Sequence, residues 1–267
     1  LYLWLAALAA VTDDQKNVLN NIQLDQFNTY LLHGVTGSGK TEVYIEAISE
    51  VLKSGKSALV LVPEISLTPQ LVRRFAERFT DEIAVIHSHL TTREKTDQWW
   101  SAVDGKNKLL IGARSALFCP IPNLGIIVID EEHETSFKQE EKLKYNARDI
   151  AVVKAHMENI PIILGSATPS LESWHNAQQG KYKLLTMDKR VSSRPLPTVE
   201  IINPLQDKDS LSDLPYWLSD TLFYKLKSNH EKGLQSALFL NRRGVAPSVQ
   251  CYSCGFIYQC PNCDISL

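Results

Sequence analysis

The sequence lacks an apolar run long enough to cross a membrane. Its longest, Leu1 to Val11, is about half the ~20 residues of a membrane-spanning helix and lacks the basic leader of a signal peptide. It also lacks a charge excess, since 28 Lys and Arg face 30 Asp and Glu, which excludes a histone-like polycation but not a local basic groove. Only 12 Gly and 12 Pro among 267 residues exclude collagen-like and low-complexity chains. We therefore expect one or two globular domains and no membrane partner.

Cysteine is also scarce, and its placement is uneven. Four of the five cysteines form two C-x2-C pairs near the end of the chain: Cys251, Cys254, Cys260 and Cys263. Nothing points to secretion, so the spacing favours zinc over disulfides. However, five residues between the pairs are fewer than the ~15–20 typical of a single four-cysteine site. The fifth, Cys119, is expected to be a buried apolar residue.

Short apolar runs alternate with helical patterns through most of the chain. The runs predict strands at 30–32, 58–62, 83–87, 109–112, 125–130 and 160–165, and the periodic segments predict helices at 12–24, 41–54, 69–79, 93–103 and 147–157. This alternation is typical of a parallel sheet covered by helices on both faces. We expect one α/β domain over 28–190, preceded by a helical segment within 1–27 that Thr12 or Asp13 caps.

A change of composition near Pro195 and Pro197 predicts a linker. Beyond it, a strand at 198–203, a helix at 215–232 and a strand at 237–240 suggest the opening of a second α/β unit. We therefore assign 191–250 to the linker and this second unit, and 251–267 to a truncated zinc-binding insertion.

The segment from Gly34 to Thr41 reads GVTGSGKT and matches the phosphate-loop pattern G-x-x-x-x-G-K-[ST] in full. It follows an apolar run and opens a helical one, which is the context that the motif requires. Backbone N–H groups of such a loop point at phosphate oxygens, Lys40 would contact the β- and γ-phosphates, and the Thr41 hydroxyl would hold Mg²⁺. A glycine-rich turn with a chance lysine is the alternative. The expected nucleotide-binding residues are Gly34, Thr36, Gly37, Ser38, Gly39, Lys40 and Thr41.

An acidic box, Asp130-Glu131-Glu132-His133, ends a second apolar run. Ligands of open α/β sheets bind at the carboxyl ends of strands, which places these acids beside the phosphate loop. We expect Asp130 to bind Mg²⁺ and Glu131 to polarise the attacking water. Glu132 and His133 are also assigned to nucleotide binding, with His133 coupling the nucleotide to a neighbouring motif. A solvated acid or a salt-bridge partner is the alternative for Glu132.

The phosphate loop, the acidic box and the segment Gly165 to Ser170 (GSATPS) together resemble superfamily 2 helicases. Longer matches resemble one branch, the bacterial primosomal replication-restart helicases (the primosomal protein N′ family), over about residues 12–267. These are GVTGSGKTEVYIEAI (34–48), LVPEISLTPQL (61–71), IGARSALFCP (111–120), IDEEHETSFKQ (129–139), YNARDIAV (145–152), ILGSATPSLESWHNAQQGKY (163–182) and LFLNRRGVAP (238–247).

The resemblance implies two RecA-like lobes with ATP and Mg²⁺ between them. This chain would hold the first lobe and the start of the second, with the cysteine-rich insertion. It further implies 3′-to-5′ unwinding at stalled forks in the bacterial cytoplasm. The implied partners are forked and single-stranded DNA, other primosome proteins, single-strand-binding protein and the replicative helicase loader.

Further roles come from the resemblance alone. Gln15 resembles an adenine-reading glutamine, with an exposed helix residue as the alternative. DNA contact or coupling is implied for Ser66, Thr68, Gln70, Arg114, Ser115, Phe137, Tyr145, Arg148, Ser166 and Thr168. Some of the hydroxyls could instead cap helices, and Phe137 and Tyr145 could instead pack inside the domain. Residues 134–148 resemble an aromatic-rich DNA-sensing loop, but Leu143-Lys144 stands where the family usually carries Trp-Arg, so one stacking platform is missing.

The resemblance also implies that two zinc ions are shared with later cysteine pairs. We therefore expect incomplete zinc sites here, and we interpret the chain as a fragment. An arginine that would face the γ-phosphate is expected beyond Leu267, so the chain itself should bind nucleotide but hydrolyse it weakly. The other candidate functions are a different superfamily 2 motor and a zinc-dependent interaction module with an inactive ATPase. The cysteine insertion argues against the former, and intact Lys40, Thr41, Asp130 and Glu131 argue against the latter.

Overall fold

The computed structural model describes residues 12–79, 83–141, 143–191, 197–203, 207, 218–239 and 256. By internal contacts the chain divides into two units, Leu1–Arg194 and Pro195–Leu267. No helix in the described ranges is both long and apolar enough to cross a membrane.

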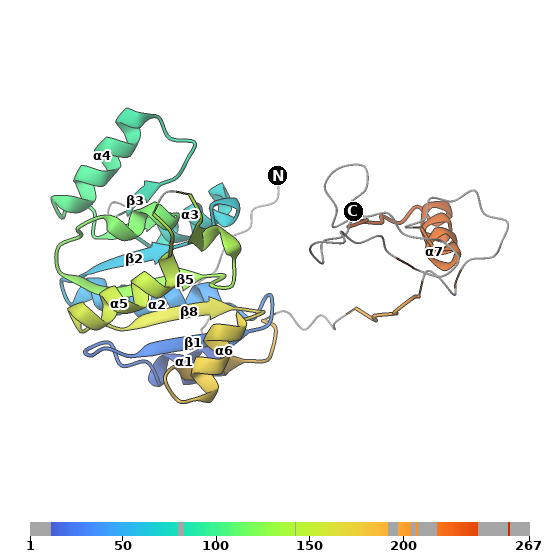
Figure 1. The fold of residues 1–267 in the computed structure, drawn as a ribbon, viewed down its shortest axis with the longest axis horizontal. Coiled ribbons are helices and arrows are strands. Elements are labelled where there is room, and N and C mark those ends of the chain that lie inside the picture. The colour runs from blue at the N-terminus through green and yellow to red at the C-terminus, as the bar shows by residue number, and fades with distance from the viewer. Residues whose placement is uncertain are drawn as a thin grey trace. The chain divides into compact units, whose positions relative to one another are not determined.

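The first unit is built on a seven-stranded sheet in the order β3-β4-β2-β5-β8-β1-β9, in which the paired strands all run parallel (Figure 1). Parallel strands need crossover connections, and helices supply most of them. The strands are β1 (Thr29–Gly34), β2 (Ser57–Leu61), β3 (Ile83–Ile86), β4 (Leu109–Gly112), β5 (Leu124–Asp130), β8 (Ile162–Ser166) and β9 (Lys183–Met187). A separate antiparallel pair joins β6 (Lys138–Gln139) to β7 (Tyr145–Asn146).

Two apolar clusters cover the two faces of this sheet. Successive strand residues point to opposite faces, so Val60 packs in one cluster and its neighbours Leu59 and Leu61 in the other. Because both faces are buried, the strands are continuous apolar runs rather than alternating ones. Cys119 is buried in the second cluster, as expected from sequence.

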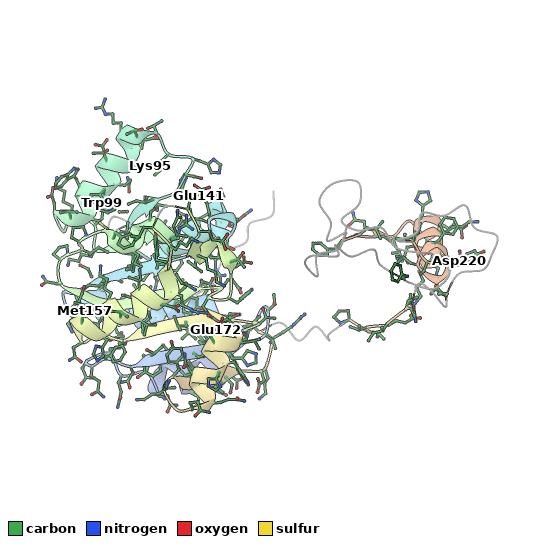
Figure 2. The ribbon with its side chains drawn as sticks, in the orientation of Figure 1. Lys95, Trp99, Glu141, Met157, Glu172 and Asp220 are labelled. Carbon is green, nitrogen blue, oxygen red and sulfur yellow. The ribbon has the colours of Figure 1, made fainter. Side chains whose placement is uncertain are left out.

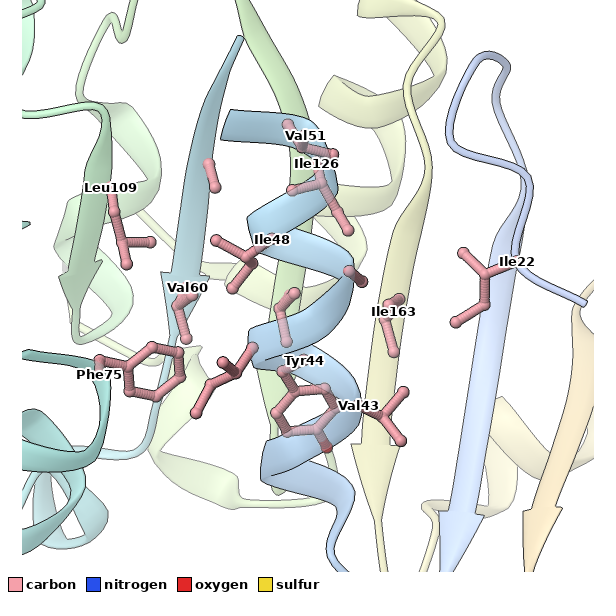
Figure 3. Packing of buried hydrophobic residues seen from close by; sticks show 14 of the residues in the cluster. Ile22, Val43, Tyr44, Ile48, Val51, Val60, Phe75, Leu109, Ile126 and Ile163 are labelled. Carbon is pink, nitrogen blue, oxygen red and sulfur yellow. The ribbon is translucent and has the colours of Figure 1, made fainter. Parts of the chain in front are cut away.

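Helices α1 (Asp13–Asn20), α2 (Lys40–Lys53) and α3 (Pro69–Arg78) contribute to the first cluster. Figure 3 shows Tyr44 and Ile48 of α2 on the same side of the sheet as Phe75 of α3. Helices α4 (Thr92–Val103), α5 (Ala147–Glu158) and α6 (Leu171–Gln178) pack against the second cluster. Ala151 and Ala155 of α5 face the sheet, whereas Met157 points to the surface (Figure 2).

Helix boundaries follow local signals. Thr12 caps α1 in a capping box with Gln15, and Thr91 caps α4 in a capping box with Glu94. Thr68 caps α3 with Pro69 at its first position. The three short 3₁₀ turns are η1 (Glu64–Ser66), η2 (Arg114–Phe118) and η3 (Thr135–Phe137), each following the carboxyl end of a strand.

In the second unit the described residues contain one helix, α7 (Asp220–Glu231), within the range predicted from sequence. The strand predicted at 198–203 is wrong, because residues 197–203 are irregular and Val199 and Ile201 are 80% and 94% exposed. A strand also fails to form at 237–239, where Phe239 is 89% exposed. Apolar β-branched residues form strands only where a neighbouring strand and a buried face are available, and no such neighbour pairs with them in the described part of the chain.

Candidate nucleotide site and strand-contact surface

The phosphate loop joins the end of β1 to the start of α2, as its sequence predicts. Gly37 and Gly39 take positive φ angles of 82° and 88°, a region that favours glycine, and Gly39 is the N-cap of α2. The Lys40 ammonium is buried and donates a hydrogen bond to the Gly34 carbonyl oxygen over 2.8 Å. The loop thus directs a helix N-terminus and a lysine to one point, which is an anion-binding arrangement.

Gln15 connects α1 to the phosphate loop. Its Nε2 donates to the Gly39 carbonyl oxygen over 3.2 Å, and its Oε1 accepts from the Thr12 backbone N–H over 2.7 Å. The side chain is buried, so the alternative of an exposed helix residue is wrong. Gln15 lines the cavity beside the loop, and both its amide nitrogen and its amide oxygen already have hydrogen-bond partners within the protein.

The loop carries an orphaned polar atom. The Ser38 Oγ is buried and makes no hydrogen bond within the protein. A side chain at Gly34 would approach that Oγ to 2.6 Å, and one at Gly39 would approach the Gln15 amide to 2.3 Å. A backbone this tightly drawn around an unsatisfied hydroxyl fits a ligand rich in hydrogen-bond acceptors, as a polyphosphate is.

Asp130 ends β5 and faces this loop. Its Oδ1 accepts a hydrogen bond from the Tyr44 hydroxyl over 3.0 Å. Burial raises the pKa of Asp130 above its ordinary value of 3.8, although Tyr44 and Lys40 oppose the shift. Burial, reinforced by the Asp130 charge, also raises the pKa of Tyr44 well above 10.0, so the phenol keeps its proton and remains a donor.

Glu131 leaves the strand in a left-handed conformation with φ of 48°, which is uncommon for a residue other than glycine. Burial, followed by repulsion from Asp130, raises the pKa of its carboxyl group. A carboxylate with a raised pKa is a stronger base at neutral pH, which suits the activation of water.

These groups share one cavity of about 370 Å³. Of the residues expected from sequence to bind nucleotide, the lining includes Gln15, Thr36, Gly37, Gly39, Lys40, Thr41, Asp130 and Glu131. Gly34 and Ser38 belong to the phosphate loop but not to the lining of the cavity. Glu42, Arg74, Thr12 and Val191 complete the lining and were not expected from sequence.

Glu132 does not belong to this cavity, which corrects its assignment to nucleotide binding. Its side chain is fully buried, and its Oε2 accepts from the Arg148 Nη1 over 3.1 Å and from the Ser173 hydroxyl over 2.8 Å. Its Oε1 accepts from the Ser170 backbone N–H over 2.7 Å. Of its two alternatives, the solvated acid is wrong and the salt-bridge partner is right, because Glu132 pairs with Arg148 in a buried polar cluster with Ser170 and Ser173.

Arg148 belongs to the same cluster and is also bonded to Asp149 and the Ser170 hydroxyl. Burial alone would lower its pKa, but hydrogen bonds and attraction from Asp149 and Glu132 raise it. With its side chain only 8% exposed, Arg148 is placed to hold elements together rather than to touch DNA.

His133 links the acidic box to the segment after β8. Its Nδ1 lies 2.8 Å from the Ser166 hydroxyl, and its Nε2 lies 3.4 Å from the Thr168 hydroxyl. The Ser166 hydroxyl in turn accepts from the Thr168 backbone N–H over 2.9 Å. The structure therefore brings together the two motifs that the sequence expected His133 to couple.

A second cavity of about 130 Å³ opens at the carboxyl ends of β2 and β4. It is lined by Val62, Glu64, Ala113, Arg114, Ser115, Ser136 and Phe137. The Arg114 guanidinium donates to the Ser136 carbonyl oxygen over 3.2 Å and to the Lys138 carbonyl oxygen, and Ser115 is exposed. Two segments expected to contact DNA thus meet at this edge.

The other expected strand-contact residues have different environments. Thr68 caps α3 by accepting from the Leu71 N–H over 3.3 Å, which was its alternative role. Ser66 is half-buried in η1, and Gln70 is exposed on the first turn of α3.

The expectation that Phe137 stacks on DNA bases is wrong. It is 1% exposed and packs in the second apolar cluster, so its ring is not available to a base. Tyr145 is half-buried, with its ring edge-on to Phe118 at 5.3 Å and the Arg114 guanidinium 6.0 Å from its centroid. Leu143 is 76% exposed.

The four paired cysteines lie outside the described residues. Within the described ranges, no three His, Cys, Asp or Glu residues are clustered so that they could hold a metal ion. Sequence reasoning also missed Tyr44, Ser170 and Ser173. A tyrosine one turn into a phosphate-loop helix, and hydroxyls at the start of the helix after GSATP, were the available signals.

Comparison with known proteins agrees with the family resemblance found in the sequence. Residues 12–177 match the DEAD/DEAH box helicase family. The chain is 47% identical over 261 residues to Replication restart protein PriA of Bacillus subtilis (strain 168), covering 96% of this chain and 32% of the relative. It is 50% identical over 238 residues to the protein of the same name from Haemophilus influenzae, covering 89% of this chain and 32% of the relative. The chain therefore spans about a third of the length of these relatives.

A solved structure shares the fold. RecG bound to a three-way DNA junction is 25% identical with a TM-score of 0.52, and the match covers 69% of this chain and 25% of that chain. The RecA-like parallel sheet and the resemblance to replication-restart helicases, both expected from sequence, are confirmed.

Proposed function

Because this chain belongs to the DEAD/DEAH box helicase family, we propose that it is the ATP-binding lobe of a 3′-to-5′ DNA helicase that acts in replication restart at stalled forks. The observation that carries the proposal is the convergence of Lys40, Thr41, Asp130 and Glu131 on one cavity. Likeness to the PriA relatives supports the restart role, and RecG in its junction complex supports DNA as the substrate.

The phosphate loop binds and orients the triphosphate. Backbone N–H groups at the start of α2 and the Ser38 hydroxyl donate to phosphate oxygens, and Lys40 exchanges the Gly34 carbonyl for the β- and γ-phosphates. The Thr41 hydroxyl and the Asp130 carboxylate hold Mg²⁺, which when bound neutralises charge on the leaving phosphate.

Glu131 acts as the base. Its carboxylate accepts a proton from the attacking water, and its raised pKa increases its strength as an acceptor. The acid limb of the pH–rate profile should therefore lie above the ordinary Glu value of 4.5, because rate is lost as pH falls through the raised pKa.

His133 carries the signal outward. Its two ring nitrogens face the Ser166 and Thr168 hydroxyls, and its Nδ1 also lies 3.6 Å from the Glu131 Oε2, so a change in the charge of Glu131 acts on a side chain that contacts the segment after β8. Arg114 and Ser115, at the second cavity, contact the DNA backbone, with Ser66 and Gln70 beside them.

The proposal extends to the whole protein's partners. Forked and single-stranded DNA, other primosome proteins, single-strand-binding protein and the replicative helicase loader are the proposed partners, in the bacterial cytoplasm. Cys251, Cys254, Cys260 and Cys263 are proposed as half of the ligands of two zinc sites, and metal analysis of the full-length protein tests this.

The direct test is ATP hydrolysis by the full-length protein with and without forked DNA. Lys40→Ala should abolish fork-stimulated turnover, by about 10²-fold or more, since it removes a charge that stabilises the transition state. Lys53→Ala is the matched control, because Lys53 ends the same helix and pairs with exposed Glu50. Hydrolysis that DNA does not stimulate would contradict the DNA-motor proposal, and equal loss in both variants would contradict the role of Lys40.

A further inference from the structure

Two parallel ion pairs join α2 to α3. The Arg74 Nη2 lies 2.6 Å from the Glu42 Oε1, and one helical turn further on the Arg78 Nη2 lies 2.6 Å from the Glu46 Oε1. The spacing of four residues on both helices makes the pairs equivalent in chemistry and geometry. They differ in their surroundings, because Arg74 and Glu42 line the nucleotide cavity and Arg78 and Glu46 do not.

Glu42 is badly placed for a phosphate site. It lies in the first turn of α2, next to Thr41, where the helix N-terminus and Lys40 attract anions. An unpaired carboxylate there would repel the triphosphate. Arg74 cancels that charge, and its guanidinium is the second cationic side chain of the cavity lining after Lys40.

Arg74 can leave Glu42 for another anion with little loss of folding stability. Both side chains are about half exposed, at 51% and 41%, and such a pair contributes little to stability because water solvates the separated charges almost as well. A guanidinium binds phosphate through two parallel N–H···O bonds, and phosphate carries more charge than a carboxylate. The bound nucleotide is therefore a stronger partner for Arg74 than Glu42 is.

We propose that Arg74 is a second phosphate-binding cation of this cavity, held by Glu42 in the free protein and transferred to the polyphosphate when nucleotide binds. The proposal rests on the proposed function, in that the cavity is the ATP site. It adds a consequence for α3: the helix that Thr68 caps, next to the expected strand contacts, gains a direct bond to the nucleotide.

The test is equilibrium binding of a fluorescent ATP analogue and of the matching fluorescent adenosine to the full chain. Arg74→Ala should weaken ATP-analogue binding about tenfold and leave adenosine binding unchanged, because only the former carries phosphates. Arg74→Lys keeps the charge but loses the two parallel donors, so its affinity should lie between those of Arg74→Ala and the unsubstituted chain. Arg78→Ala removes the same charge from the same helix and should leave both affinities within about twofold.

Variants of Glu42 separate direct contact from neutralisation. Glu42→Gln should tighten ATP-analogue binding, and the double variant with Arg74→Ala should bind more weakly than Glu42→Gln alone. If the double variant binds as tightly as Glu42→Gln, Arg74 only neutralises Glu42 and the proposal is wrong. Equal effects of Arg74→Ala and Arg78→Ala would also overturn it. If Lys40→Ala bound the ATP analogue as tightly as the unsubstituted chain does, the proposed function itself would be contradicted.

Discussion

Glu131 and Glu132 are neighbours in the chain but lie in opposite environments. Glu131 lines a cavity, takes a left-handed backbone conformation and has a raised pKa. Glu132 faces the interior, where Arg148, Ser170 and Ser173 occupy its oxygens. Although they are adjacent, the Glu131 carboxylate is available for chemistry, whereas the Glu132 carboxylate holds three segments of the chain together.

The difference extends to the regions around them. The cavity combines a raised Asp130 pKa, an orphaned Ser38 hydroxyl and positive φ angles, all of which cost folding free energy. In the buried cluster, both carboxylate oxygens of Glu132 accept hydrogen bonds from Arg148, Ser170 or Ser173. The cavity thus keeps groups available for a ligand, whereas the cluster uses its polar groups to hold the surrounding segments together.

The comparison predicts first that Glu131→Gln abolishes chemistry without harming the fold. Turnover in the full-length protein should fall by about 10²–10⁴-fold, because the amide cannot accept the proton from water. Nucleotide affinity and melting temperature should be unchanged or higher. Steady-state hydrolysis beside thermal melting measures both. A loss of only a few-fold would remove Glu131 from the role of base.

Glu132→Ala should do the reverse. Arg148 would lose its buried carboxylate and keep only the largely exposed Asp149 as an anionic partner. Because breaking a buried pair costs about 3–5 kcal/mol in unfolding free energy, we expect a loss toward the lower end of that range. Urea unfolding of the chain measures this. The control is Glu77→Ala, which breaks the exposed Arg73–Glu77 pair and should cost under about 1 kcal/mol.

An apolar replacement sharpens this result. Glu132→Leu combined with Arg148→Met should recover part of the lost stability, because neither charge then remains buried and unpaired. If Glu132→Ala were no more destabilising than Glu77→Ala, the buried cluster would not be the frame of the site.

Asp130→Asn should stabilise the protein at neutral pH, because burial disfavours the charged carboxylate. A raised folded-state pKa means that this penalty is present above that pKa and is lost as pH falls through it toward 3.8. Melting temperatures of the two proteins should therefore converge in acid. A gap that widens on acidification would contradict burial as the cause.

The smallest expected effect belongs to Gln15, which lines the cavity and also completes the capping box of α1. Gln15→Ala should lower stability by about 0.5–1 kcal/mol through the lost capping box. The adenine-reading role, which stays a prediction, requires a further loss of preference for an ATP analogue over a GTP analogue. Thr91→Ala removes a cap far from the cavity and should lower stability without changing that preference. An unchanged preference in both variants would limit Gln15 to capping and loop support.

The sequence predicts the first unit well because its signals are local. The phosphate loop, the box at the end of β5 and most of the sheet strands depend on residues within about ten positions. The strands at 198–203 and 237–240 were predicted from the same kind of apolar run, but a strand also needs a partner that the run itself does not encode. Strand β9 and helix α6 were missed because Lys183–Met187 is mostly exposed at a sheet edge and α6 is short and polar.

At the site, the directions of the side chains were harder to predict from sequence than the positions of the motifs. The sequence of the acidic box does not distinguish Glu131 from Glu132, because the hydrogen-bond partners of Glu132 lie up to 41 residues away. Phe137 was expected to stack on bases because residues 134–148 resemble an aromatic-rich DNA-sensing loop, yet its ring packs in the second apolar cluster. Both errors arise from long-range packing, which a single sequence does not show.

The last described stretch of the first unit runs back to the phosphate loop. Val35 donates its N–H to the Met187 carbonyl oxygen over 3.2 Å, and Val191 donates its N–H to the Gly37 carbonyl oxygen over 3.0 Å. The end of β9 and Val191 are therefore bonded directly to the backbone of the phosphate loop, on either side of Thr36. A shift of the loop backbone would lengthen or shorten these two bonds before any other contact of Met187 and Val191 changes.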